Sequence, residues 1–171
     1  MQNEVAEICK DSVESGENTF FRYAAVVEYI GTSYAGSQIQ ENARTVQSEI
    51  ESVLKTLLRK ETKVVFSGRT DRGVHSKGQV IHFDVDKEID TYRFIYSMNA
   101  LLPSDISIAA LTEVDHSFNA QKSALYRWYR YRISTKPQRS VWSRESLNVR
   151  GKLDIESMQK ALKYLEGKHD F

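Results

Sequence analysis

Residues 62–85 read "TKVVFSGRTDRGVHSKGQVIHFDV", in which two runs rich in β-branched and aromatic residues flank a turn with three glycines. The runs "TKVVFSG" and "GQVIHFDV" each predict a strand, and the turn links the two. Alternation along the second run places Ile81, Phe83 and Val85 on one face and Val80, His82 and Asp84 on the other. This strand therefore has one apolar face and one mixed face.

The sequence around this pair predicts four further elements. They are a strand over 23–30, a helix that follows Thr45 and runs to the region of Lys60, a helix over 91–102 that Pro103 ends, and a strand over 105–114. Thr45 can cap its helix, because apolar residues recur after it at spacings of three and four. The order strand, helix, strand, strand, helix, strand is the ferredoxin-like βαββαβ arrangement, predicted for about residues 22–114. The predicted fold class is α+β.

The rest of the chain predicts an extension and part of a second unit. Residues 1–19 are polar and acidic, and we expect them to form a mobile extension. Residues 20–115 form the first predicted subdomain. Residues 116–171 supply only a strand that begins at "LYRWYRYRIS" and a helix over 153–166, which cannot close another sheet. We therefore expect 116–171 to be the start of a C-terminal subdomain that is truncated.

Composition narrows the class of protein. Cys9 is the only cysteine, which excludes a disulfide framework and a cysteine-based zinc site and favours a reducing cytoplasm. No apolar run approaches the roughly 18 residues of a membrane span, and the N-terminus does not resemble a signal peptide. No phosphate-binding glycine loop is present, and His75 and His82 are too sparse to predict a metal site. We predict a soluble, cytoplasmic protein without a metal.

The charge is unevenly distributed along the chain. The formal net charge is +1, but residues 1–19 contribute −4, which leaves +5 for residues 20–171. Between His116 and Arg144 lie seven Lys or Arg residues and no acid. Such a stretch suits a polyanionic partner, and a solvated basic face is the alternative.

The run "YRWYRYR" at 126–132 alternates arginines with aromatic residues. In a strand, one face would carry Arg127, Tyr129 and Tyr131, and the other would carry Tyr126, Trp128, Arg130 and Arg132. Such a surface can stack nucleobases, each contributing roughly 1–3 kcal/mol. An aromatic strand that packs a core is the alternative.

Asp71 is the one acid in the glycine-bearing turn, where it lies among Arg69, Arg72, His75 and Lys77. Nearby cations favour the ionised carboxylate, which suits a nucleophile or an electrostatic stabiliser better than a general acid. The glycines would let the backbone turn tightly and approach a ligand. An Arg–Asp pair that only fixes the turn is the alternative.

Several motifs resemble those of the tRNA pseudouridine synthase A family. "GRTDRGVHSKGQVIHF" is similar to its Gly-Arg-Thr-Asp-x-Gly-Val-His signature. "VEYIGTSYAGSQIQ", "TVQSEIESVL" and "NALLPSDISI" resemble its first strand and glycine loop, its first helix and its Asn-x-x-Leu-Pro-x-Asp-Ile segment. "SFNAQKSALYRWYRYRI" resembles the stretch that carries its active-site tyrosine. The resemblance covers about residues 22–171, and the family continues for roughly another third of a chain.

The resemblance implies a function and a set of site residues. The family isomerises uridine to pseudouridine in the anticodon arm of tRNA, as a homodimer without metal or organic cofactor, on a mixed sheet made from two ferredoxin-like halves. The resemblance makes Asp71 the catalytic carboxylate and Tyr129 the active-site tyrosine. It makes Arg69 the residue that pairs with Asp71 and helps to displace the base. The implied substrate-binding residues are Thr70, Gly73, His75, Arg127, Arg130 and Gln38.

The leading hypothesis is therefore a tRNA pseudouridine synthase. The alternative is a catalytically incomplete RNA-binding module or fragment, in which the basic surface binds tRNA but the shortened cleft does not turn over. A third, weaker hypothesis is a glycoside or nucleoside hydrolase that uses Asp71 and Asp84, although Asp71 has too many cations around it to serve as the acid.

Overall fold

The computed structural model describes residues 20–138, 140–143 and 145–170. The predicted acidic extension, residues 1–19, lies outside the described residues. The chain divides into two compact units, the first ending at Tyr126 and the second beginning at Arg127. The predicted subdomain boundary between residues 115 and 116 stays a prediction.

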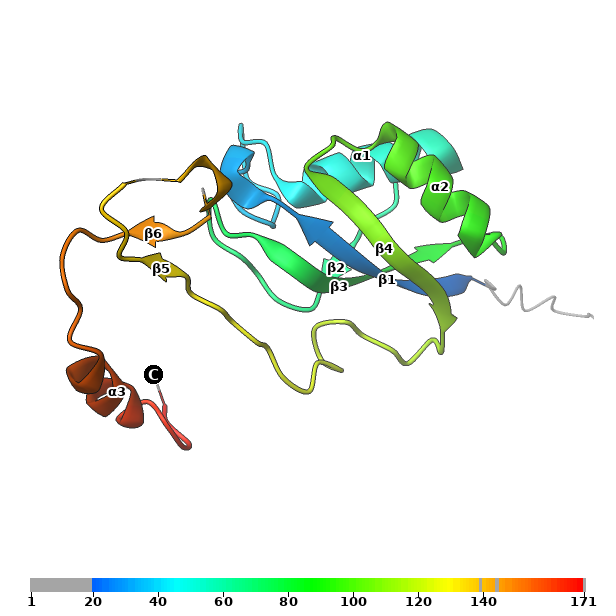
Figure 1. The fold of residues 1–171 in the computed structure, drawn as a ribbon. Coiled ribbons are helices and arrows are strands. Elements are labelled where there is room, and N and C mark those ends of the chain that lie inside the picture. Colours follow the sequence, from blue (N-terminus) through cyan, green and yellow to red (C-terminus); the bar gives the residue numbers. More distant parts are fainter. Residues whose placement is uncertain (1–19, 139, 144, 171) are drawn as a thin grey trace, which may run out of the picture. The chain divides into compact units, whose positions relative to one another are not determined.

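The first unit contains a four-stranded antiparallel sheet with two helices on one face (Figure 1). Its elements are β1 (Phe21–Tyr29), the 3₁₀ turn η1 (Gly31–Ser33), α1 (Val46–Leu58), β2 (Val65–Phe66), β3 (Ser76–Val85), α2 (Thr91–Leu101) and β4 (Ile106–Val114). The strands lie in the order β2-β3-β1-β4, and every neighbouring pair is antiparallel. The predicted α+β class is thus confirmed for this unit.

The core lies between the sheet and the two helices. Ile81, Phe83 and Val85 of β3 are buried there, as the alternation predicts. Register places Ile81 opposite Ala25 and Phe83 opposite Tyr23, both on β1. The helices contribute Ile50, Leu54, Phe94 and Met98 to the same cluster. Because burial of apolar side chains is the main favourable term in folding, this layer determines which residues face away from the helices.

Both helices begin at the polar residues that precede their apolar pattern. The Thr45 hydroxyl accepts a hydrogen bond from the Ser48 amide, and the Ser48 hydroxyl accepts one from the Thr45 amide, both at 3.1 Å. This is a capping box with serine in its last position, so the predicted role of Thr45 is confirmed. Asp90 caps α2 by accepting from the Arg93 amide at 3.1 Å.

The segment after β4 covers part of the face opposite the helices. The Arg22 guanidinium binds both carboxylate oxygens of Asp84, at 2.7 and 2.8 Å, and also donates to the carbonyls of His116 and Phe118. Beside it, the Ala120 amide donates to Nδ1 of His82 at 3.1 Å. Burial of the imidazole, and to a lesser degree the nearby Arg22, lowers the pKa of His82. The polar face of β3 is therefore largely used for holding this segment.

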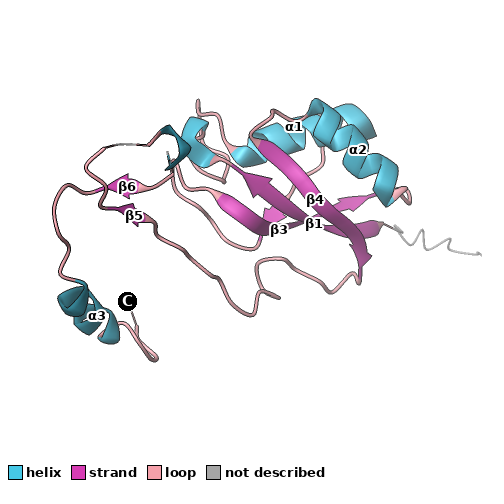
Figure 2. Ribbon diagram, viewed as in Figure 1, coloured by secondary structure: helices cyan, strands magenta, loops and turns pink. Residues whose placement is uncertain are grey.

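The second unit contains β5 (Ile133–Ser134), η2 (Val141–Ser143), β6 (Leu147–Asn148) and α3 (Ile155–Lys163). β5 and β6 pair in parallel over two residues each. The predicted strand at "LYRWYRYRIS" is wrong over residues 125–132, which lie in no helix or strand (Figure 2). Only Ile133–Ser134 pairs, so the predicted division of 126–132 into two sheet faces does not hold. No described helix of either unit could span a membrane.

Candidate active site

Three segments that are distant in the sequence meet at one end of the sheet. They are the end of β1, the connection 67–75 between β2 and β3, and the residues just before β4. The Tyr29 hydroxyl is hydrogen-bonded to Oγ1 of Thr70 at 2.8 Å, and the Ile30 amide donates to the Asp105 carbonyl at 2.9 Å. This end of the sheet therefore holds the connection that carries Asp71.

The loop after β1 is joined to the Asp71 connection through Ser37 and Thr70. The Ser37 amide donates to the Thr70 carbonyl at 3.0 Å, and the Thr70 amide donates to the Ser37 hydroxyl at 2.9 Å. Gly36, with φ +129°, lets the loop come this close, because a Cβ there would lie 2.9 Å from the Thr70 carbonyl oxygen. The residue before Asp71 is thereby held from a second loop.

A second junction lies at Gly31 and His75. The Gly31 amide donates to Nδ1 of His75 at 3.2 Å, so this ring nitrogen is the unprotonated one. A Cβ on Gly31 would lie 2.0 Å from the Val74 carbonyl oxygen, so only glycine fits at this position. His75, one of the implied substrate-binding residues, is therefore hydrogen-bonded to the neighbouring loop.

Asp71 itself starts a β-turn that ends at Val74. The Val74 amide donates to the Asp71 carbonyl at 3.2 Å, and Gly73 has φ +80°, the value of the third position of a type II turn. The Asp71 side chain is exposed and, among the described residues, has no hydrogen-bond or ion-pair partner. Among the described residues no arginine pairs with Asp71, and a backbone hydrogen bond closes the turn instead.

The cations around Asp71 are also exposed. Within residues 20–138, the side chains of Arg69, Arg72 and Lys77 make no ion pair. The contact between Arg69 and Asp71 that the resemblance implies stays a prediction. Gln38, another implied substrate contact, is exposed beside the buried Ser37.

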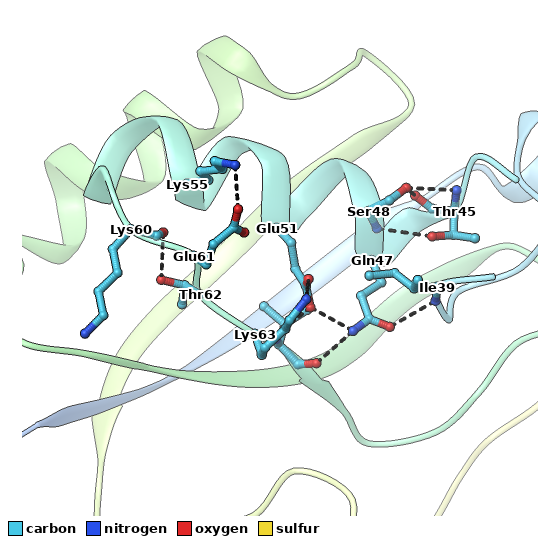
Figure 3. Close-up of polar contacts among 11 residues, drawn as sticks. Ile39, Thr45, Gln47, Ser48, Glu51, Lys55, Lys60, Glu61, Thr62 and Lys63 are labelled. Carbon is cyan, nitrogen blue, oxygen red and sulfur yellow. Dashed lines mark hydrogen bonds and ion pairs between the residues drawn. The ribbon is translucent and has the colours of Figure 1, made fainter. Parts of the chain in front are cut away.

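A polar cluster on α1 holds the opposite end of the first loop (Figure 3). The Gln47 side chain accepts from the Ile39 amide at 3.1 Å and donates to the Glu51 carboxylate at 2.8 Å and to the Val64 carbonyl at 3.2 Å. Glu51 in turn accepts from the Val64 amide at 3.1 Å and from Lys63 at 3.0 Å. Because Val64 binds α1 through both backbone groups, β2 is shorter than the predicted "TKVVFSG" strand and begins at Val65.

The base of the Asp71 connection is held by Gln79 of β3. Its amide nitrogen donates to the Gly68 carbonyl at 2.5 Å, and its amide oxygen accepts from the Ser67 hydroxyl at 2.7 Å. Gln79 is buried, which is uncommon for glutamine without such partners. It therefore fixes the direction in which the connection leaves β2.

Tyr34 joins the first loop to the segment before β4. Its hydroxyl donates to the Asp105 carboxylate, and the Arg44 guanidinium lies over its ring, 4.8 Å from the centroid. Burial, together with the bond to Asp105, strongly raises the pKa of Tyr34. This phenol is a structural donor that stays protonated at neutral pH.

Asp84 does not belong to this site. Both of its carboxylate oxygens accept from Arg22, on the face of the sheet that residues 116–120 cover. A carboxylate committed to a guanidinium is unsuited to protonating a leaving group. The hydrolase hypothesis with Asp71 and Asp84 therefore finds no support in this geometry.

Three of the predicted site residues lie in the second unit. Arg127, Tyr129 and Arg130 belong to the run 125–132, where Tyr129 is 69% exposed. Arg130 lies over the ring of Trp128, 4.9 Å from its centroid. The site described for the first unit thus comprises Arg69, Thr70, Asp71, Gly73, His75 and Gln38, without these three.

The residues that sequence reasoning missed are the ones that hold the loops. Tyr29, Ser37 and Gln79 were assigned no role, yet they bind Thr70 and Gly68. The one signal that could have indicated Ser37 and Gln79 is that each polar side chain directly follows a glycine, Gly36 or Gly78. No group of three or more potential metal ligands occurs among the described residues.

The fold and the site define a class: an α+β protein that presents a carboxylate on a turn of one glycine-bearing loop, which a second glycine-bearing loop holds. The sequence model of one family, described as tRNA pseudouridine synthase, matches residues 25–121, which include both loops and Asp71. This chain belongs to that family.

Many curated proteins are similar to the chain, and several of them are named tRNA pseudouridine synthase A. The protein from Bacillus pumilus is 44% identical over 148 residues, which are 85% of this chain and 60% of that protein. The protein from Ruminiclostridium cellulolyticum is 46% identical over 146 residues, with the same two shares. The chain therefore spans about 60% of the length of the curated relatives it matches.

Proposed function

We propose that this chain isomerises uridine to pseudouridine in the anticodon arm of tRNA, with Asp71 as the nucleophile. One observation carries the proposal: the Asp71 carboxylate is exposed and unpaired among the described residues, on a turn whose neighbours are fixed by Ser37 and Gly31. An unpaired anion on a rigid support is free to bond to a substrate atom. The names of the relatives support uridine in tRNA as the substrate.

The reaction is a redox-neutral rearrangement of one nucleoside. The bond from C1′ of the ribose to N1 of uracil breaks, and a bond from C1′ to C5 forms. The hydrogen on C5 leaves as a proton, and N1 gains a proton, so atoms and electrons balance. Asp71 supplies the electron pair for attack on either the sugar or the ring and recovers it when the product forms. The base must first leave its stack, which costs a few kcal/mol.

The other residues have supporting roles in this proposal. Arg69 pairs with Asp71 once substrate is bound and occupies the space left by the displaced base. Thr70, Gly73 and His75 hold the turn, and Gln38 contacts the RNA from the first loop. From the second unit, Tyr129 packs against the uracil and moves a proton, while Arg127 and Arg130 contact phosphates.

We also assign the first unit to the ferredoxin-like half of a pseudouridine synthase fold. The strand order β2-β3-β1-β4 with both helices on one face supports this assignment. Residues 116–171 would begin the second half. A homodimer acting in the cytoplasm is part of the same proposal.

The test is release of tritium from tRNA transcripts labelled at C5 of uridine. We expect the chain to release tritium, and Asp71→Asn to reduce the rate by about 1,000-fold or more, the scale of losing a nucleophile. Asp86→Asn is the matched control, because Asp86 pairs with Lys60 on the surface, after the far end of β3. If Asp71→Asn retained pseudouridine formation, the nucleophile assignment would be wrong.

A catalytically incomplete RNA-binding module is the second candidate, favoured by the exposed basic side chains around Asp71. Salt-sensitive binding of tRNA without any tritium release would identify it. Free uracil released from RNA would instead indicate a hydrolase.

A further inference from the structure

The basic residues of the first unit fall into two groups. Six of its twelve Lys and Arg side chains between residues 20 and 126 are in ion pairs: Arg22, Arg44, Lys55, Lys60, Lys63 and Arg93. The other six are Arg59, Arg69, Arg72, Lys77, Lys87 and Lys122. Three of these lie between residues 69 and 77. Unpaired cations are thus concentrated at the end of the sheet that carries Asp71.

The local sequence explains why these cations have no ion-pair partner among the described residues. Asp71 is the one acidic residue between Thr62 and Phe83, and its carboxylate binds none of them. The acids that pair elsewhere in the unit lie on α1, in the connection between α1 and β2, after the far end of β3, or on the covered face of the sheet. The positive charge at this end is therefore available to an anionic ligand.

Arg72 has a fixed backbone position within this group. It is the second residue of the turn from Asp71 to Val74, and its side chain is exposed. The loop after β1 lies close to the backbone of Arg72, because a Cβ on Gly36 would lie 3.7 Å from the Arg72 amide nitrogen. Lys77 is exposed at the second position of β3, beside Gly78, around which a Cβ would have open space.

We propose that Arg72 and Lys77 bind the two phosphates that flank the nucleotide held at Asp71. The inference rests on the proposed function, because it requires RNA at this turn. A guanidinium binds a phosphate through two parallel hydrogen bonds, whereas an ammonium acts as a point charge. Arg72 is therefore the residue that orients the backbone, and Lys77 adds attraction. Arg69 is not included, since its proposed role is toward Asp71.

The experiment measures binding of the whole 171-residue chain to an unmodified tRNA transcript by fluorescence anisotropy at a series of salt concentrations. The variants are Arg72→Ala, Arg72→Lys and Lys77→Ala. Lys87→Ala is the matched control, because Lys87 is also exposed and unpaired but follows the opposite end of β3.

Each lost phosphate contact lowers the slope of log K against log salt by about 0.7–0.9. We expect that decrease for Arg72→Ala and for Lys77→Ala, with binding about 3–10-fold weaker at about 0.1 M salt. Arg72→Lys keeps the slope but loses part of the affinity, because one charge remains without the bidentate geometry. Lys87→Ala changes neither quantity.

The outcomes separate this inference from the proposed function. An unchanged slope in Arg72→Ala, an equal decrease in Lys87→Ala, or no tRNA binding by the chain would each overturn the phosphate assignment. If the slopes are unaffected while tritium release depends on Asp71, the phosphate assignment alone is wrong. If the slopes decrease as expected but no tritium is released, the catalytic proposal alone is wrong.

Discussion

Ser37 and Thr70, 33 residues apart in sequence, bind each other through both backbone and side chain. The Ser37 hydroxyl accepts from the Thr70 amide and contacts the Thr70 carbonyl oxygen at 3.5 Å, while the Ser37 amide donates to that carbonyl at 3.0 Å. Because Thr70 directly precedes Asp71, the buried serine determines how the carboxylate is presented.

Replacement of Ser37 tests this contact. Ser37→Ala leaves the Thr70 amide without its acceptor in a buried setting, which costs about 1–3 kcal/mol of unfolding free energy. Urea denaturation measures the loss, and Ser107→Ala, at an exposed position of β4, is the control. Equal stability of the two variants would contradict the role of Ser37.

Replacement by alanine should have opposite effects on stability at Gly31 and at Gly78. Gly31→Ala forces a methyl group to 2.0 Å from the Val74 carbonyl oxygen, and we expect it to destabilise the chain by at least about 1–3 kcal/mol. Gly78→Ala meets nothing within 4 Å and should be neutral or stabilise by about 0.4–1 kcal/mol, since alanine restricts the unfolded chain. Thermal unfolding measures the stability of both variants. A similar loss of stability in the two would contradict the close contact between Gly31 and Val74.

His82 should make the unfolding free energy depend on pH in the acidic range. Its pKa is lowered in the folded state by burial and by Arg22, with Asp84 acting weakly in the opposite sense. Below about pH 6.5 the unfolded chain therefore binds a proton that the folded chain resists, so the unfolding free energy falls as the pH decreases. His82→Gln keeps an acceptor for Ala120 but does not titrate, so its stability should fall less over this range. Parallel pH profiles of the two proteins would show that His82 is not responsible.

Tyr34 makes stability depend on alkali. Burial and the Asp105 carboxylate raise its folded-state pKa above the ordinary value near 10. The unfolded chain then loses a proton that the folded chain keeps, so stability falls as the pH rises above about 10. Tyr34→Phe should remove this alkaline decrease, while costing about 1.5–3 kcal/mol at neutral pH through the lost bond to a charged group. Tyr92→Phe, on the exposed side of α2, is the control, and an unchanged alkaline decrease in Tyr34→Phe would refute the assignment.

The elements of the first unit follow from local patterns in the sequence. Alternation in β3 indicates the buried set Ile81, Phe83 and Val85, and Thr45 indicates the start of α1, because both signals lie within a few adjacent residues. The length of β2 does not follow from such a pattern. It depends on Gln47 and Glu51, which bind the backbone of Val64 from another element.

The run 125–132 and the loop contacts also depend on residues that are distant in the sequence, so local patterns do not predict them. Alternating aromatic and basic residues predict a strand, but a strand also needs a partner edge, and the described part of the second unit pairs only β5 with β6. The sequence indicates that Asp71 lies in a turn, because glycines and basic residues surround it. The side chains that hold it, Ser37 and Gln79, act across distant segments, and one sequence does not show which hydroxyl or amide meets which carbonyl.

The fit between Gly31 and Val74 has a consequence for protein engineering. Residues 67–75 cannot be transplanted as an independent cassette, because their shape is complementary to that of residues 31–37. A chimaera in which one of these loops is replaced by a loop of unrelated sequence should misfold locally, whereas transfer of both loops together should preserve their contacts. The two loops are therefore one structural unit built from two separate segments of the sequence.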